Sequence, residues 1–169
     1  AKAKRVGFEA NFATVGQIDA LMRAIREARL EVELVPLENV MSNLRKVKDD
    51  QEIGLIRKSV AIAEEAYEAL LGEIKPGLTE NYLAGLLVLE LRSRGASNSS
   101  FPVIVAAGAN SSLPHYRPGE TLGQRDQPLL IDWGALAGGD VAVLTPTLMI
   151  GRVTPKMKEI YKVVLKAQL

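Results

Sequence analysis

Apolar side chains recur every three to four residues in four stretches of this chain. That spacing places them along one side of a helix, so each stretch predicts an amphipathic helix. An Asp or Thr that can cap a helix stands at the start of the last three, while Lys75-Pro76-Gly77 and Gly95 are typical helix ends. The predicted helices are 14–28, 50–74, 79–94 and 154–169.

The N-terminal part of the chain has a βαβ-like pattern. Short strand-like runs at 5–9 and 30–35 flank the first predicted helix. A fragment of about 40 residues is too small to bury a core of its own. We therefore expect residues 1–44 to be the C-terminal remnant of a preceding α/β domain, with a polar joint over 41–49.

Three apolar, partly β-branched runs follow the helical middle of the chain. They cover 101–107, 129–133 and 141–150, and the last two flank a glycine-rich segment at 134–139. This arrangement predicts three antiparallel strands. The expected fold class of residues 45–169 is α/β of the α+β kind, with helices packed on an antiparallel sheet.

Composition narrows the function classes. The chain has 169 residues, 47% of them hydrophobic, and its 21 Lys plus Arg nearly balance 20 Asp plus Glu. A formal net charge of +1 gives no reason to expect nucleic acid or an anionic membrane as a partner. The chain has no cysteine, which fits a reducing compartment. We expect a folded, soluble, cytoplasmic protein.

Asp132 is the first candidate for chemistry because it ends the apolar run Leu129-Leu130-Ile131. A buried carboxylate must be paired, hydrogen-bonded or bound to a cation, since a bare buried charge is costly. Two interpretations follow: Asp132 caps backbone N–H groups of the glycine turn, or it retains affinity for a metal ion. Trp133, the single tryptophan, is expected to fill the core.

Several short motifs follow one another along the chain from Arg45 to the last residue. They are RKVKD at 45–49 followed by Glu52-Ile53, IKPGLTE at 74–80, FPVIV at 101–105 with GAN at 108–110 and PHY at 114–116, DWGA at 132–135, and the helix after Gly151. These motifs and their order resemble the pita-bread metallopeptidases, the family of aminopeptidase P, prolidase, methionine aminopeptidase and creatinase.

The resemblance implies a pita-bread-like half domain, that is, the first half of the catalytic domain, at 45–169. Residues 1–44 resemble the end of the creatinase/prolidase-like N-terminal domain. The implied parent activity is hydrolysis of a peptide bond before proline, with two divalent metals (Mn, Co or Zn) as cofactors. Asp132 matches a metal ligand of the family, and His115 matches the catalytic histidine that holds the substrate carbonyl or steadies the oxyanion.

The departures from the family pattern are as specific as the matches. Where the family has a second ligating Asp and an Arg, this chain has Val143 and Pro146. The family also takes one His and two Glu from a later half of the domain, so one of five expected ligands remains. Asp140 could replace the missing ligand only if a β-bulge turned its side chain to the same face of the strand as Val143. We expect a degenerate site with no bound metal.

Two functions stay open. The first is an Xaa-Pro aminopeptidase- or dipeptidase-like fragment or homologue that is inactive as a single chain, because paired metals need several anionic ligands. The second is a non-catalytic scaffold that binds a peptide or a protein. In either case a homodimer, or a second chain that supplies the missing half, is an expected partner.

Overall fold

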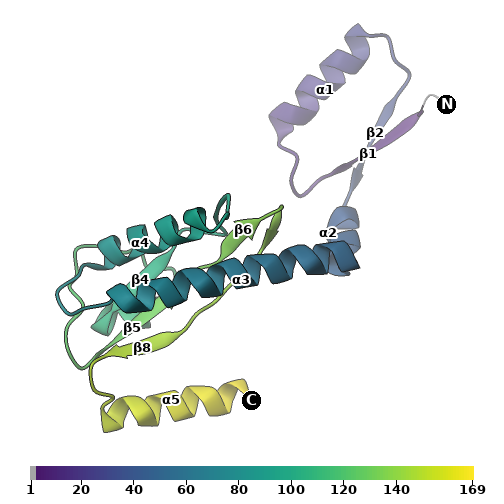
Figure 1. Cartoon of the computed structure of the whole chain (residues 1–169). Helices are drawn as coiled ribbons and strands as arrows, with labels where there is room; N and C mark the ends of the chain where they lie inside the picture. Colours follow the sequence, from purple (N-terminus) through teal and green to yellow (C-terminus); the bar gives the residue numbers. More distant parts are fainter. Residues whose placement is uncertain (1–2) are drawn as a thin grey trace. The chain divides into compact units, whose positions relative to one another are not determined.

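The computed structural model describes residues 3–169 and divides the chain into two compact units (Figure 1). The first unit ends at Asp49 and the second begins at Asp50. Among the described residues, no helix is long and apolar enough to cross a membrane.

The first unit contains the predicted βαβ arrangement. Its two strands pair in parallel, from Arg5 opposite Glu33 to Glu9 opposite Leu37. Thr14 caps the helix between them: its hydroxyl accepts from Gln17 N, and the Gln17 side chain accepts from Thr14 N. The elements are β1 (Arg5–Glu9), α1 (Val15–Glu27), β2 (Glu33–Leu37) and α2 (Val40–Lys46).

The predicted polar joint at 41–49 ends where the first unit ends, but it contains a helix that was not predicted, since α2 occupies 40–46. Asn39 precedes this helix in the left-handed conformation and its side chain caps nothing. The Glu9 carboxylate, at the end of β1, accepts from Met41 N at 2.6 Å instead. A cap from 32 residues away is invisible to a local pattern.

The second unit begins with two long helices, α3 (Asp50–Glu73) and α4 (Glu80–Ser93), that pack on each other and on one face of the sheets (Figure 1). The predicted stripe of α3 is partly right. Ala63 and Leu70 are fully buried, but Leu71 is 44% exposed. The buried face of α3 consists of Ser59, Ile62, Ala63, Ala66 and Leu70.

Short strands form two three-stranded antiparallel sheets in this unit. One has the order β4-β5-β8 and the other β3-β6-β7. The predicted three antiparallel strands are confirmed, but the expected continuous strand over 141–150 is wrong. Its middle contains Pro146, which has no N–H to donate to a ladder. The strands are β3 (Asn98–Ser99), β4 (Ile104–Ala107), β5 (Gln127–Asp132), β6 (Ala135–Ala137), β7 (Asp140–Val141) and β8 (Thr147–Ile150).

The β5-to-β8 hairpin keeps one register along its whole length. Leu130 faces Thr147, Trp133 faces Leu144 and Ala137 faces Asp140, with no residue inserted on either side. Side chains therefore alternate regularly between two faces. Leu129, Ile131, Trp133, Ala135 and Ala137 share the buried face toward the helices. Asp132, Val143 and Thr145 share the opposite face.

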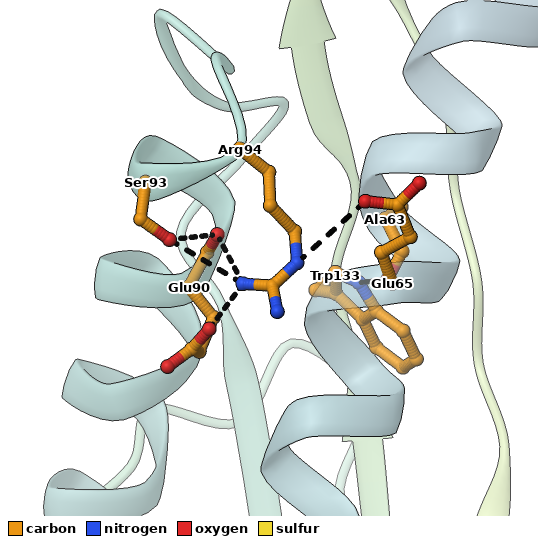
Figure 2. Close-up of polar contacts among 6 residues, drawn as sticks. All are labelled: Ala63, Glu65, Glu90, Ser93, Arg94 and Trp133. Carbon is orange, nitrogen blue, oxygen red and sulfur yellow. Dashed lines mark hydrogen bonds and ion pairs between the residues drawn. The ribbon is translucent and has the colours of Figure 1, made fainter.

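Trp133 fills the core, as predicted. It is fully buried, its ring stacks on Tyr67 with centroids 4.9 Å apart, and its Nε1 donates to Ala63 O at 3.3 Å. Figure 2 shows Trp133 beside Ala63, and Arg94 reaching from the end of α4 toward α3. Arg94 pairs with Glu90 on its own helix, and its Nε lies 3.8 Å from Glu65 Oε2 on α3. The two helices are thus joined at their outer surface as well as through the core.

The chain ends in α5 (Pro155–Gln168), capped by Thr154 as predicted. This helix buries no residue, and its apolar Ile160, Tyr161 and Val164 are exposed. A 3-10 helix, η1 (Gly108–Ser112), follows β4.

Asp126 directly precedes β5, and its N–H donates to Ile150 O at the end of β8. Its side chain gives a pH-dependent prediction. Its carboxylate accepts from the Arg152 side chain at 2.9 Å and from Arg152 N at 2.8 Å, and these bonds lower the pKa of Asp126 below its ordinary 3.8. A carboxyl with a depressed folded-state pKa stabilises the fold above its unfolded pKa and stops doing so as the pH falls through the folded pKa. We expect wild type to exceed Asp126→Asn in stability at neutral pH, with the difference shrinking as the pH falls below 3.8 and through the lower folded-state pKa.

Urea unfolding from pH 2 to 7 measures this difference, and Asn is a suited replacement because it tolerates the left-handed backbone at this position, φ 61°. Glu159→Gln, which removes an exposed carboxylate on α5, is the control. A constant difference between wild type and Asp126→Asn across the range would contradict the assignment.

Candidate functional site

The two residues singled out from the sequence line one cavity. It has a volume of about 460 Å³, and its walls are Phe101, Pro102, Ile104, His115, Arg117, Asp132 and Val143. Strand pairing explains part of this gathering, since Ile104 of β4 directly faces Asp132 of β5. His115 and Arg117 come from the loop after η1. All the lining residues belong to the second unit.

Asp132 is hydrogen-bonded to the segment that lies opposite it in the hairpin. Its Oδ1 accepts a hydrogen bond from Thr145 Oγ1 at 2.9 Å, as expected for residues that lie opposite each other in the register. The tight turn of the hairpin is at Gly138 and Gly139, both with positive φ, at the far end of the ladder. The interpretation that Asp132 caps that turn is therefore wrong, because the hydrogen bond to its Oδ1 comes from Thr145 and not from the turn.

Val143 stands at the position where the resemblance leads us to expect a second carboxylate. It lies on the same hairpin face as Asp132, lines the same cavity and is 60% exposed. Asp140 does not substitute for it. The register contains no bulge, so Asp140 lies on the opposite, helix-covered face, where Ser59 Oγ of α3 donates to Asp140 O at 3.0 Å.

The donor set of this chain does not fit a pair of divalent ions. Within residues 3–169, no three of its His, Asp and Glu side chains gather where a metal could be held. Two adjacent divalent ions need several anionic ligands to offset their mutual repulsion. Asp132 with the Thr145 hydroxyl offers one anionic group.

His115 is exposed and stands in the left-handed conformation with φ 54°. In the part of the chain that the structure describes, its imidazole makes no hydrogen bond. The loop backbone alone therefore places this ring at the cavity. Arg117 is exposed and also lines the cavity, so a cation and an anion flank the apolar wall of the cavity.

Glu80 is the residue that the sequence analysis missed. An acidic residue directly after a cap such as Thr79 is ordinary at a helix start, so no local signal set it apart. The structure shows it 1% exposed, with both oxygens bonded to the loop that carries His115. Oε1 accepts from Ala107 N at 2.8 Å and Asn110 Nδ2 at 2.9 Å, and Oε2 accepts from Tyr116 OH at 2.8 Å and Gly119 N at 3.1 Å.

Tyr116 shows the electrostatic effect of this carboxylate. The hydrogen bond that its hydroxyl donates to Glu80, and secondly burial, raise the pKa of the phenol above its ordinary 10.0. Asn110 Nδ2 also donates to Tyr116 OH at 2.8 Å. Tyr116 is the immediate neighbour of His115, so the network reaches the cavity through one peptide bond.

Comparison with known proteins points to one family. The family model described as metallopeptidase family M24 matches residues 54–169. The chain is 37% identical to an uncharacterized peptidase, YqhT, of Bacillus subtilis over 98% of this chain and 46% of that protein. It is 33% identical to the Xaa-Pro dipeptidase of Pyrococcus furiosus over 80% of this chain and 39% of that one.

Solved structures agree. An Xaa-Pro dipeptidase from Bacillus anthracis matches with a TM-score of 0.88 and 34% identity, over 97% of this chain and 45% of that chain. An X-Pro aminopeptidase from Thermotoga maritima matches with a TM-score of 0.89 and 28% identity, over 97% and 46%. The chain thus spans about half the length of the relatives that it matches, and the pita-bread fold expected for it is confirmed.

Proposed function

Because this chain belongs to metallopeptidase family M24, a family that uses divalent metals, we propose that it is an Xaa-Pro peptidase-like half that is not catalytically competent as a single chain. In this proposal residues 1–44 are the remnant of an N-terminal domain, and residues 45–169 are the first half of the catalytic-type domain. The similarity to Xaa-Pro dipeptidases over about half their length supports this assignment.

One observation carries the proposal: the cavity brings His115 and Asp132 together but presents Val143 where a second carboxylate is needed. In the family the metals supply an activated water. Without metals, the residues of this chain can bind and orient a peptide. The His115 imidazole can donate to a peptide carbonyl, and Asp132, fixed by Thr145, can accept from a peptide N–H or ammonium group.

We expect no turnover of an Xaa-Pro dipeptide by this chain with Mn²⁺ or Co²⁺, and no calorimetric binding of either ion tighter than about 1 mM, because one carboxylate cannot hold these ions against water. Product release measured by chromatography, and metal titration of the same sample, test both statements. Micromolar metal binding, or turnover that disappears in His115→Ala, would show that the chain is catalytically competent.

A peptide-binding scaffold is the second candidate function. The apolar wall of Phe101, Pro102 and Ile104, flanked by Arg117 and Asp132, suits a short peptide with one apolar side chain and two charged ends. The exposed apolar side chains of α5 further support completion of the domain by more protein, either a second copy or another chain. Calorimetric titration of an Xaa-Pro dipeptide separates this candidate from a chain that does not bind peptide at all.

A further inference from the structure

We infer that Glu80 is a positioning residue for His115, holding the loop that places the imidazole at the cavity. This inference rests on the proposed function, in which His115 contacts the bound peptide. It adds a residue that lies outside the cavity wall and acts only through the loop.

The loop is closed at its base by the N-terminal end of α4. Thr79 bridges Leu122, Glu80 N donates to Thr121 O at 3.0 Å, and Asn81 N donates to Gly119 O at 3.0 Å. These backbone bonds fix where the loop returns. They contact nothing between Ala109 and Pro118, which is the part that contains His115.

The Glu80 side chain fixes that remaining part. Through Asn110 it holds η1, through Tyr116 it holds the residue after His115, and through Ala107 N and Gly119 N it ties both ends of the loop to the same carboxylate. A buried carboxylate with four donors has its hydrogen-bonding capacity filled. Losing one acceptor leaves buried donors unpaired, which costs more than the bond itself contributes.

The backbone of His115 makes this support necessary. A non-glycine residue at φ 54° occupies a sparsely populated conformation, which persists only where surrounding contacts hold it. In residues 3–169 the imidazole makes no hydrogen bond that would hold it directly. The support therefore comes through Tyr116, and from Tyr116 through Glu80.

Glu80→Gln tests the inference, with Glu90→Gln as the matched control on the same helix. Both variants remove one negative charge, but Glu90 bonds Arg94 at the other end of α4. The amide introduced by Glu80→Gln would turn an NH₂ group toward one of the two pairs of donors. Because the chain has a single histidine, the imidazole signals in a ¹H–¹³C NMR spectrum report on His115 alone.

We expect Glu80→Gln to shift or split the His115 imidazole signals and to weaken binding of an Xaa-Pro dipeptide about tenfold, that is, by about 1.4 kcal/mol. Glu90→Gln should leave both as in wild type. Tyr116→Phe, which removes one of the four donors and keeps the charge, should shift the same signals by less, and it decides the question if Glu80→Gln does not fold by circular dichroism.

His115 signals identical to wild type in a folded Glu80→Gln, or in Tyr116→Phe where that variant decides, would overturn the positioning role. A purely stabilising Glu80 would lower the melting temperature and leave the imidazole signals in place. If wild type itself does not bind the dipeptide, the proposed peptide site fails, while the imidazole signals still decide whether Glu80 positions His115.

Discussion

Replacing Trp133 with Ala should destabilise the second unit by about 3–5 kcal/mol, the usual cost of deleting a large buried aromatic side chain. Trp133 is fully buried where α3 lies against the hairpin, so its removal leaves a cavity between two layers. The substitution also removes the stacking on Tyr67, which contributes of order 1 kcal/mol beyond buried area. Such a loss is a large share of the roughly 5–15 kcal/mol that stabilises a typical domain.

Urea unfolding followed by far-ultraviolet circular dichroism measures this effect without relying on the tryptophan itself. Trp133→Phe keeps most of the ring and loses the bond to Ala63 O, so we expect a smaller loss of about 1–2 kcal/mol. Tyr82→Ala on α4, where the ring is 54% exposed, is the control and should stay within about 0.5 kcal/mol of wild type. Equal midpoints for Trp133→Ala and the control would contradict the central place of Trp133 in the core.

Replacing Val143 with Asp should raise the affinity of the chain for Mn²⁺ at least about tenfold, because ligand charge count tunes such sites over several orders of magnitude. The new carboxylate would share the hairpin face and the cavity with Asp132 and lie next to the Thr145 hydroxyl. Val143 is 60% exposed, so the substitution gives up little buried apolar area. The Mn²⁺ affinity of Val143→Asp therefore distinguishes two possibilities: a site that lacks one ligand, and a hairpin that cannot bind a metal ion even with that ligand restored.

Calorimetric titration of Mn²⁺ into wild type and Val143→Asp gives the ratio of affinities. Val143→Asn supplies a similar shape without charge and should behave as wild type. Adding Asp132→Asn to Val143→Asp should abolish the gain, since both carboxylates are then required. A gain that survives in this double variant, or no gain at all, would mean that Asp132 and residue 143 do not form one metal site.

Much of the fold could be predicted from the sequence. The helix after Thr154 and the one between Thr79 and Gly95 follow from caps, stops and apolar spacing, which act within a few residues. One miss has a long-range cause and the other a local one. The short helix α2 depends on the Glu9 carboxylate at Met41 N, and the interruption of the strand over 141–150 follows Pro146.

Two residues of the candidate site could be predicted from the sequence, but their spatial arrangement could be predicted only in part. Asp132 and His115 were found from the end of an apolar run and from a resemblance, and they do line one cavity. Glu80 was missed because an acidic residue at a helix start has an ordinary local explanation. Its role shows only when residues 107–119 are folded over it.

The sequence by itself determined the long helices of this protein and its resemblance to a peptidase family, in which Val143 stands where a carboxylate is expected. These features are local, because helical period, capping and residue identity are read within a few positions. Only the tertiary structure decided that Thr145 holds Asp132, that Asp140 lies on the far face, and that Glu80 holds the His115 loop. Each of these depends on strand register or on burial, and both arise from contacts between residues distant in the chain.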